Sequence, residues 1–386
     1  MVNIDEVLTR RVTNIIPNKA KLEELLKNGK KLNVYLGIDP TATRIHIGHA
    51  VPLRKLQEFV ELGHNVTFLI GDATALIGDT SDKDGERPVL TSAEIKSNFK
   101  TYKKQASKIL DFSKVKVRFN STWLKKLNYL DTVKLAQEFS FGEFAGRELI
   151  KKRLQDKKHV GLHEALYPVM QGYDSYFLDT DIQIGGADQT FNMQAGRILQ
   201  SNIRSKESFV LVTGYLTGTD GRKMSKSWGN AIWLSDTADE IYGKTMSLPD
   251  DLIVEYFENA TNTNESKISK IKKALKGGIN PVEVKKELAL TLTTELTNKK
   301  LAVKARNNFA KSFQKHEPEY TQEIKLQKSL AETIAPFTNL KSSSDAKRLI
   351  QQGGLTIDGD VVSDLNYKIK KGDKIKIGKK IFGKLI

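Results

Sequence analysis

Two histidines stand three residues apart, at His46 and His49, where a predicted strand over 33–38 gives way through a polar turn to a predicted helix. Side chains at that spacing share one face of a helix. The first N–H groups of a helix lack partners within it, and the helix dipole favours negative charge there. The pair therefore predicts a site for a phosphate group that gains charge during a reaction.

Two lysines, Lys223 and Lys226, lie in the segment TGTDGRKMSKSWGN at 217–230. The glycines and serines of this segment predict a mobile loop. Ammonium groups neutralise polyphosphates, so such a loop suits a phosphate leaving group. The alternative is an ordinary exposed basic loop.

A third group of polar residues falls on one face of a predicted helix, because Tyr167, Gln171 and Asp174 stand at i, i+4 and i+7. A phenol, an amide and a carboxylate make a poor core. They predict a pocket for a molecule that carries both an ammonium group and a hydroxyl group. The turn at 185–189 follows a short strand, and its Asp188 could accept a ribose hydroxyl.

These residues need elements that bring them together. Continuous apolar runs at 33–38 and 66–71, joined by a helix, predict a parallel sheet covered on both faces. Ligands bind such sheets at the carboxyl ends of strands. A single aspartate there is usually a turn or N-cap residue, but several polar residues follow strand ends: Asp39, Asp72, Thr74 and Asp79, and Asn120 after a third strand at 115–119.

Composition excludes several kinds of chemistry. The chain has no cysteine and only 6 histidines, which excludes disulfides, thiolate catalysis and a zinc site of the Cys/His kind. It has no apolar run near the roughly 20 residues of a membrane helix, and its first 22 residues contain no apolar signal region, which argues against export. A length of 386 residues predicts two or three domains.

Charge is uneven along the chain. Residues 261–386 carry 26 lysines and arginines against 13 acids, which is most of the net charge of +16. A basic C-terminal third predicts a polyanionic partner, most often nucleic acid, although a lysine-rich solvated surface is the alternative. Patterning divides the chain at 1–235, 236–331 and 332–386, and a short helix over 344–352 turns Lys347 and Arg348 outward.

The motif HIGH at 46–49 together with KMSKS at 223–227 resembles the signature pair of class I aminoacyl-tRNA synthetases. The wording YLGIDPTATRIHIGH, ALIGDTSD, YPVMQGYD and GGADQ resembles the bacterial tyrosyl-tRNA synthetases. The C-terminal SSSDAKRLIQQGGLTIDGDVV and GDKIKIGKK look like the small alpha-L RNA-binding domain of the compact bacterial subtype. The resemblance implies an α/β fold with a Rossmann-like catalytic domain, then an α-helical tRNA-binding domain and a small α+β RNA-binding domain.

The resemblance also implies a role for each matching residue. The tyrosine site would comprise Tyr35 and Asp174 at the phenol, Asp79, Tyr167 and Gln171 at the ammonium group, and Asn120 and Gln189 nearby. The nucleotide would lie along Gly37, Asp39, Gly48, Gly186 and Asp188. His46 and His49 would stabilise the reacting phosphate, Lys223 and Lys226 would hold pyrophosphate, and Lys347 and Arg348 would contact RNA.

In that reading a cytoplasmic homodimer, paired near 120–165, consumes L-tyrosine, ATP and tRNA(Tyr). Mg²⁺ arrives with ATP, and no tightly bound metal site is expected. Two departures from the pattern are Thr80, where relatives usually have proline, and the segment SDKDGERP at 81–88, which differs from the common Ser-Gly-Lys wording. In addition, Leu36 offers the ribose no polar contact. No role is assigned to Lys83 or Arg87.

Three alternatives remain open at the level of sequence. The tryptophanyl enzymes share both motifs, but the Tyr35–Asp174 pair and the alpha-L wording favour tyrosine. A synthetase-derived RNA-binding protein without ligase activity is disfavoured by the intact motif lysines. A small-molecule adenylyltransferase is disfavoured by the basic C-terminal third.

Overall fold

The computed structural model describes residues 3–78, 90–226, 228–311, 320, 322–338, 341–378 and 381–386. The chain forms two compact units, Met1–Ala302 and Val303–Ile386. The expected division into three domains at 235 and 331 stays a prediction. Within the described ranges, no helix is long and apolar enough to cross a membrane.

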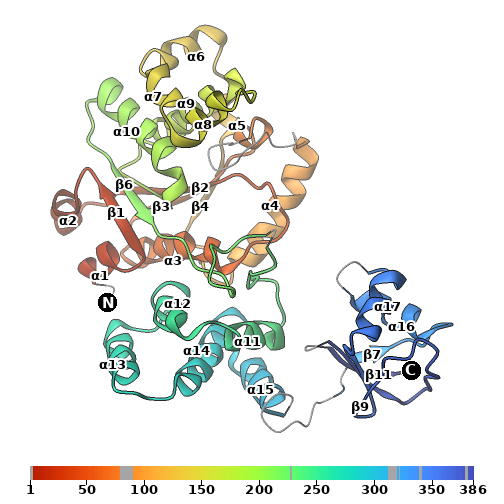
Figure 1. The fold of residues 1–386 in the computed structure, drawn as a ribbon. Coiled ribbons are helices and arrows are strands. Elements are labelled where there is room, and N and C mark those ends of the chain that lie inside the picture. Colours follow the sequence, from red (N-terminus) through yellow and green to blue (C-terminus); the bar gives the residue numbers. More distant parts are fainter. Residues whose placement is uncertain are drawn as a thin grey trace. The chain divides into compact units, whose positions relative to one another are not determined.

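A six-stranded sheet with the order β1-β6-β5-β2-β3-β4 forms the centre of the first unit (Figure 1). Neighbouring strands from β6 to β4 run parallel, and β1 is antiparallel to β6. The strands are β1 (Val12–Ile16), β2 (Asn33–Ile38), β3 (Asn65–Ile70), β4 (Lys116–Phe119), β5 (Ile182–Gly186) and β6 (Phe209–Thr213). Every residue of β6 is buried, as expected for a strand covered on both faces. The predicted parallel-sheet α/β fold is confirmed.

The apolar spacing over 5–30 predicts one or two helices, and the structure differs from this prediction in part. The segment contains the short helices α1 (Ile4–Thr9) and α2 (Lys19–Lys27), but Val12–Ile16 between them is strand β1. The apolar spacing of this segment also fits a helix. Its β-branched residues instead pair with β6, where tertiary hydrogen bonds outweigh local preference.

Helices cover the sheet and extend beyond one end of it (Figure 1). Those that accompany the sheet are α3 (Ile47–Glu61), α4 (Ser92–Ala106), α5 (Ser121–Leu124), α6 (Tyr129–Ala136), α7 (Phe141–Ala145), α8 (Glu148–Gln155), α9 (Leu162–Phe177) and α10 (Thr190–Arg204). α4 opens with a capping box, in which the side chain of Thr91 accepts from the backbone N–H of Glu94. β2 and β5 are neighbours although α3 to α9 separate them in sequence, so the strand order reverses between them. Such a reversal opens a crevice at the carboxyl ends of the strands.

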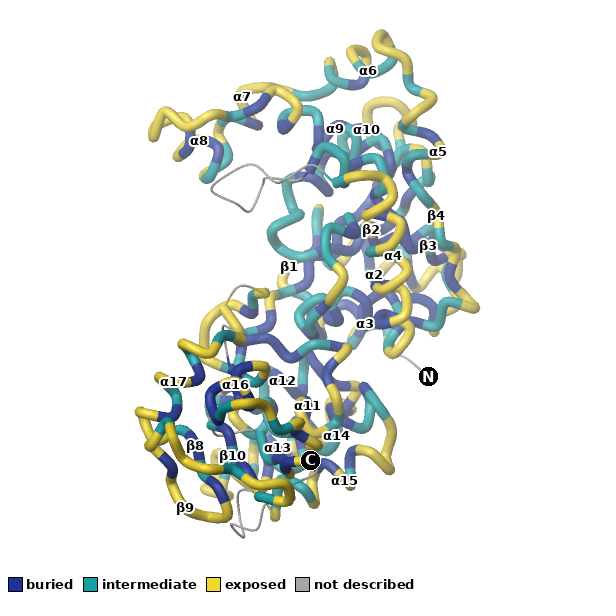
Figure 2. The backbone as a smooth tube through the Cα atoms, turned by 90° about the vertical axis from the view of Figure 1, so that its right-hand side faces the viewer, coloured by how far each residue is buried: buried dark blue, intermediate teal, exposed yellow. Residues whose placement is uncertain are grey.

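The helical part of the first unit comprises α11 (Ala238–Met246), α12 (Ile253–Ala260), α13 (Glu265–Lys276) and α14 (Pro281–Leu296), and α15 (Lys299–Phe309) spans the boundary between the two units. It shares one apolar core with the sheet region, since Phe59 of α3 and Phe257 of α12 belong to the same buried cluster. Figure 2 shows dark blue, buried backbone running through both regions. The two regions of this unit are therefore packed as one body.

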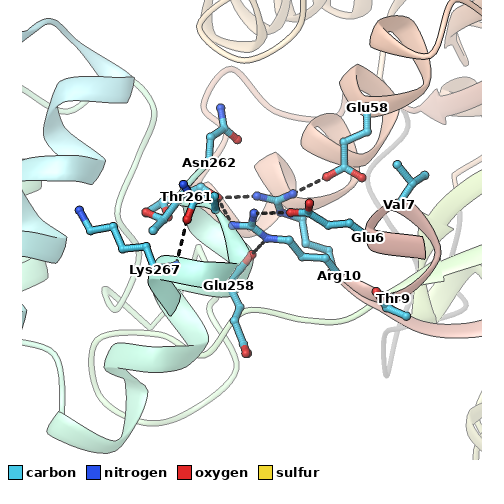
Figure 3. Close-up of polar contacts among 12 residues, drawn as sticks. Glu6, Val7, Thr9, Arg10, Glu58, Glu258, Thr261, Asn262 and Lys267 are labelled. Atoms are coloured by element: carbon cyan, nitrogen blue, oxygen red, sulfur yellow. Dashed lines mark hydrogen bonds and ion pairs between the residues drawn. The ribbon is translucent and has the colours of Figure 1, made fainter. Parts of the chain in front are cut away.

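Buried arginines reinforce that junction (Figure 3). Arg10 donates to the carbonyl oxygens of Phe257 at 3.1 Å and Thr261 at 2.8 Å, and Arg11 also donates to Thr261. These carbonyl groups belong to the last turn of α12 and the residue after it, where a helix leaves its acceptors without internal partners. Arg11 forms an ion pair with Glu58 of α3 as well. The start of the chain thus ties the C-terminal end of α12 to α3.

The second unit is a five-stranded sheet with two helices on one face. Its strands, in the order β7-β11-β10-β8-β9, are β7 (Gln322–Ile324), β8 (Leu355–Ile357), β9 (Asp360–Val361), β10 (Lys374–Ile377) and β11 (Ile381–Leu385). Helices α16 (Leu330–Ile334) and α17 (Ser343–Gln351) complete its own apolar core. On α17, Ala346 and Ile350 are buried, whereas Lys347 and Arg348 are exposed as predicted.

Candidate active site

A cleft of about 900 Å³ lies at the carboxyl ends of β2 and β5. It brings together residues far apart in sequence, among them these predicted site residues: Tyr35, Gly37, Asp39, His46, Gly48, His49, Tyr167, Gln171, Asp174, Gly186, Asp188, Gln189, Lys223 and Lys226. Asn120 lies behind the cleft wall and bonds to Asp174. Asp79, Thr80, Lys83 and Arg87 fall outside the described residues. Lys347 and Arg348 belong to the second unit.

The two histidines form a close pair at the N-terminus of α3. His46 is the N-cap residue, its ring centroid lies 3.9 Å from that of His49, and its backbone N–H donates to Nδ1 of His49 at 3.3 Å. Burial, aided by Lys226, lowers the pKa of His46 to about 2 and that of His49 to about 4. Both rings are therefore neutral at pH 7. Since Nδ1 of His49 accepts, its proton sits on Nε2, and that N–H is available to a ligand.

His46 also carries an unsatisfied atom. Its buried Nδ1 has no hydrogen-bond partner among the residues that the structure describes. Gly48 makes this packing possible, because a Cβ at that position would stand 2.9 Å from the same nitrogen. By contrast, a Cβ at Gly37 would meet Tyr35 at an ordinary 3.5 Å, so packing in the empty cleft does not require glycine there.

Residues 217–232 between β6 and α11 form a loop that we call the lysine loop, after Lys223 and Lys226. Hydrogen bonds from the side chain of Asn230 hold this loop together. The side chain of Asn230 donates to Asp220 at 2.7 Å and accepts from the backbone N–H of Ser225 at 2.9 Å. Lys223 places its Nζ 3.6 Å from the ring centroid of Tyr215, a cation–π contact at the cleft edge. Lys226 also lines the cleft. Both lysines therefore line the same cavity as the histidine pair, and their charges help to lower the pKa of His46.

Both ends of this loop are fixed to other elements. At its start, Glu255 of α12 accepts from the backbone N–H of Thr217 at 2.8 Å, and Tyr256 donates to the Thr217 carbonyl at 2.6 Å. At its end, the backbone of Ile47 donates to Ile232 at 2.9 Å, which joins the loop to the first residue of α3. The loop is thus anchored to α12 and to the histidine helix.

The opposite end of the cleft is built around Asp174. Its carboxylate accepts from Trp123 Nε1 at 2.7 Å and from Asn120 Nδ2 at 3.0 Å. Burial raises the pKa of Asp174 to about 8, although these two donors lower it. Tyr35 donates its hydroxyl to Gln183 at 2.9 Å, and burial raises the pKa of its phenol well above the usual value. A buried carboxyl group and a buried phenol thus lie at one end of the cavity.

Asp39, in the turn after β2, is bonded to side chains from two other segments. Its carboxylate accepts from Thr74 at 2.7 Å and from Tyr167 at 2.9 Å. Asp188 lies in the short 3₁₀ helix Ala187–Gln189 that leads into α10. Gln189 donates to Asp188 at 3.4 Å.

Several supporting residues escaped the sequence-based prediction. Trp123 and Gln183 complete the polar shell around Asp174 and Tyr35, and Glu255 and Tyr256 hold the root of the lysine loop. Gln183 offered one usable signal, since it is a polar residue inside an apolar strand. The others act across more than 35 residues of sequence, which no local pattern records.

Comparison with known proteins agrees with this arrangement. Residues 27–314 match the family model described as tRNA synthetases class I (W and Y), and residues 339–375 match the S4 domain. A relative from Dehalococcoides mccartyi (strain CBDB1), named tyrosine–tRNA ligase, is 40% identical over 99% of this chain and 98% of its own. A protein of the same name from Thermotoga maritima is 38% identical over 98% of this chain and 96% of its own.

Solved structures show the same fold at lower identity. A C-terminally truncated mitochondrial tyrosyl-tRNA synthetase from Aspergillus nidulans covers 81% of this chain and 95% of its own, with a TM-score of 0.68 and 23% identity. A tyrosyl-tRNA synthetase from Archaeoglobus fulgidus, complexed with L-tyrosine, covers 79% of this chain and 99% of its own, with a TM-score of 0.63 and 22% identity.

Proposed function

The chain belongs to the class I tRNA synthetases of the tryptophan and tyrosine family, and on that premise we propose that it is a tyrosine–tRNA ligase. It activates L-tyrosine with ATP and transfers the tyrosyl group to the 3′-terminal adenosine of tRNA(Tyr). One observation carries the choice of reaction, since a single cleft joins a neutral histidine pair and two loop lysines to a buried phenol–carboxyl end. The names of the full-length relatives support the same choice.

Tyrosine is selected at Asp174 and Tyr35. The substrate phenol donates to Asp174 and accepts from Tyr35. For this the Tyr35 hydroxyl rotates and exchanges its hydrogen bond to Gln183 for one to the substrate. Both side chains already have protein partners. Bound phenylalanine would therefore lack the additional hydrogen bonds that tyrosine makes, while the bonds within the protein would remain. Each additional hydrogen bond to the substrate contributes about 0.5–1.5 kcal/mol. Tyr167 and Gln171, one turn apart on α9, take the ammonium group together with Asp79.

The first step forms a bond between a tyrosine carboxylate oxygen and the α-phosphorus of ATP, and pyrophosphate leaves. Because His46 and His49 are neutral, they act as N–H donors to the α-phosphate as its charge grows and do not transfer protons. Lys223 and Lys226 hold the departing pyrophosphate. ATP enters as its Mg²⁺ complex, and its nucleoside lies along Gly37, Asp39, Gly48, Gly186 and Asp188.

The second step uses tRNA. A hydroxyl of its terminal ribose attacks the tyrosyl carbonyl, and AMP leaves. No protein nucleophile takes part, so catalysis consists of positioning and charge stabilisation. The S4 match at 339–375 supports RNA contact by the second unit, where Lys347 and Arg348 are exposed on α17.

We further propose a cytoplasmic homodimer that pairs through 120–165. This region exposes large apolar side chains, including Tyr129 at 81%, Leu130 at 66% and Phe141 at 66% exposure. Figure 2 shows yellow, exposed residues along α6, α7 and α8. A second copy would remove such a surface from water. Sedimentation equilibrium of the chain and of a Leu130→Glu variant tests the pairing.

The function is tested by amino-acid-dependent exchange of pyrophosphate into ATP, followed by charging of tRNA(Tyr). Exchange with tyrosine, and not with tryptophan or phenylalanine, is expected. Exchange with tryptophan would identify the sister activity of the family. RNA binding without any exchange would instead indicate a protein that has kept the fold and lost the ligase reaction.

A further inference from the structure

A second hollow lies beside the cleft, on the other side of the end of β3. Its volume is about 780 Å³, within the range of ligand sites. Ile70 and Asp72 line this hollow, whereas Gly71 and Thr74 line the cleft. We call it the lysine hollow, after the five lysines among its lining residues: Lys96, Lys100, Lys103 and Lys104 of α4, and Lys125 after α5.

The base of the lysine hollow is apolar and aromatic. Phe99 of α4 and Phe119 of β4 meet edge to face with ring centroids 5.4 Å apart, and both are half-buried. Ile70 and Ile95 beneath them are buried. Half-buried rings at the bottom of a hollow offer the apolar surface on which a nucleobase packs.

The rim carries an unbalanced positive charge. The four lysines of α4 stand at i, i+4, i+7 and i+8, so they share one face, and all five rim lysines are exposed. None of the five forms an ion pair with an acid in the part of the chain that the structure describes. Among the described residues that line the hollow, the one acid is Asp72, which already accepts from the backbone and hydroxyl of Ser121 at 2.9 and 2.6 Å. Because residues 1–260 hold 36 basic and 33 acidic side chains, this cluster is a local excess.

We propose that the lysine hollow binds a single-stranded RNA segment, with one unpaired base against Phe99 and Phe119 and consecutive phosphates along the lysines. From Lys96 to Lys104 the helix rises about 12 Å. At roughly 3.4 Å per nucleotide of a stacked strand, that length spans three or four phosphates and exceeds what a free mononucleotide presents. That the RNA is the tRNA substrate rests on the proposed function.

The test uses the full chain with its cleft filled by a non-hydrolysable tyrosyl-adenylate analogue. The triple variant Lys100→Gln, Lys103→Gln, Lys104→Gln is compared with Lys27→Gln, Lys30→Gln, Lys31→Gln, an equal charge change around α2, beside the opposite edge of the sheet. The probe is a seven-nucleotide RNA containing 4-thiouridine. Binding should weaken about tenfold in the first variant only, and its salt slope should fall by about 2, or roughly 0.7 for each lysine.

A second variant removes an aromatic ring from the bottom of the lysine hollow and leaves an aliphatic side chain in its place. Phe99→Leu should weaken RNA binding about fivefold and should abolish the 4-thiouridine cross-link to peptides from 92–125. Unchanged affinity and salt slope in the lysine variant would overturn the proposal. Displacement of the RNA by equimolar ADP would also overturn it, in favour of a small-nucleotide site.

The same variants separate this proposal from the proposed function. Tyrosine-dependent pyrophosphate exchange should remain unchanged in the lysine variant, while its KM for tRNA in charging rises about tenfold. If the unmodified chain shows no exchange with tyrosine, the proposed function fails, and the RNA cross-link still decides the lysine hollow.

Discussion

The two ends of the cleft bury polar groups in opposite ways. At the amino-acid end, both oxygens of Asp174 and the hydroxyl of Tyr35 have protein partners. At the phosphate end, Nδ1 of His46 is buried with no partner among the described residues, and Lys223 rests against the ring of Tyr215. On the proposed function, the amino-acid end is thus organised before substrate arrives, whereas the phosphate end would be completed by the nucleotide and the loop.

The largest expected effect comes from removing the centre of the organised end. Asp174→Ala should lower kcat/KM for tyrosine in pyrophosphate exchange about a thousandfold, because the substrate phenol loses its acceptor and Asn120 and Trp123 lose theirs. The exposed Asp360→Ala in the second unit is the control. Unchanged kcat/KM for tyrosine would defeat the assignment of Asp174.

A smaller effect is expected from a substitution at the phosphate end of the cleft. Lys226→Ala should slow adenylate formation about a hundredfold in single-turnover experiments, because the departing pyrophosphate loses a positive charge. Tyrosine binding should change little, as should both quantities in Lys30→Ala. A normal single-turnover rate in Lys226→Ala would count against a role at the leaving group.

A positioning effect should be smaller again. Tyr256→Phe keeps the buried ring and removes the hydroxyl that holds the Thr217 carbonyl. Adenylate formation should slow about fivefold, with KM for tyrosine unchanged, since the anchored root of the lysine loop loosens. Tyr242→Phe on α11, which also changes a buried tyrosine, should leave the rate intact. Equal slowing in both variants would indicate a general loss of packing.

A further expected effect is on stability rather than on rate, and here the two ends should respond to pH with opposite signs. Asp174 has a raised pKa of about 8. Between about pH 4 and 8 the native state therefore holds a proton that the unfolded state has released. The contribution of Asp174 to the free energy of unfolding falls as pH rises through this range. The lowered pKa of His49, about 4, means that the unfolded state binds the proton between about pH 4 and 6.5, so its contribution grows as pH rises there.

Thermal unfolding of two variants measures these slopes. Asp174→Asn should remove a pH-dependent loss, so its stability relative to the unmodified chain should improve steadily from pH 4 to 8. His49→Asn should lose relative stability from pH 4 to 6.5 and stay constant above. Parallel pH profiles for both variants would contradict the difference between the two ends.

Local patterns predicted the parts of the site that are contiguous in sequence. The strand at 33–38, the paired histidines at the start of a helix and the outward Lys347 and Arg348 all follow from short-range periodicity, and the structure places them as expected. The α/β fold followed from continuous apolar strands and is confirmed. The roles of the individual site residues stay predictions.

Long-range contacts explain what the patterns missed. Val12–Ile16 has the spacing of a helix face and becomes a strand because β6 offers it an edge. Trp123 approaches Asp174 across 51 positions, and Glu255 approaches Thr217 across 38. A single sequence contains no record of such pairs, so these supporting residues are visible only once the chain is folded.

The arginine contacts at α12 bear on which parts of this chain can be exchanged between proteins. A fragment that ended before 253 would keep Arg10 and Arg11 while deleting the carbonyl groups of Phe257 and Thr261 that accept their hydrogen bonds. It would also release the root of the lysine loop, because Glu255 and Tyr256 would be missing. A transplantable module must therefore run from the start of the chain at least through α12, whereas the separate apolar core of the second unit is built from residues between Ile324 and Leu385.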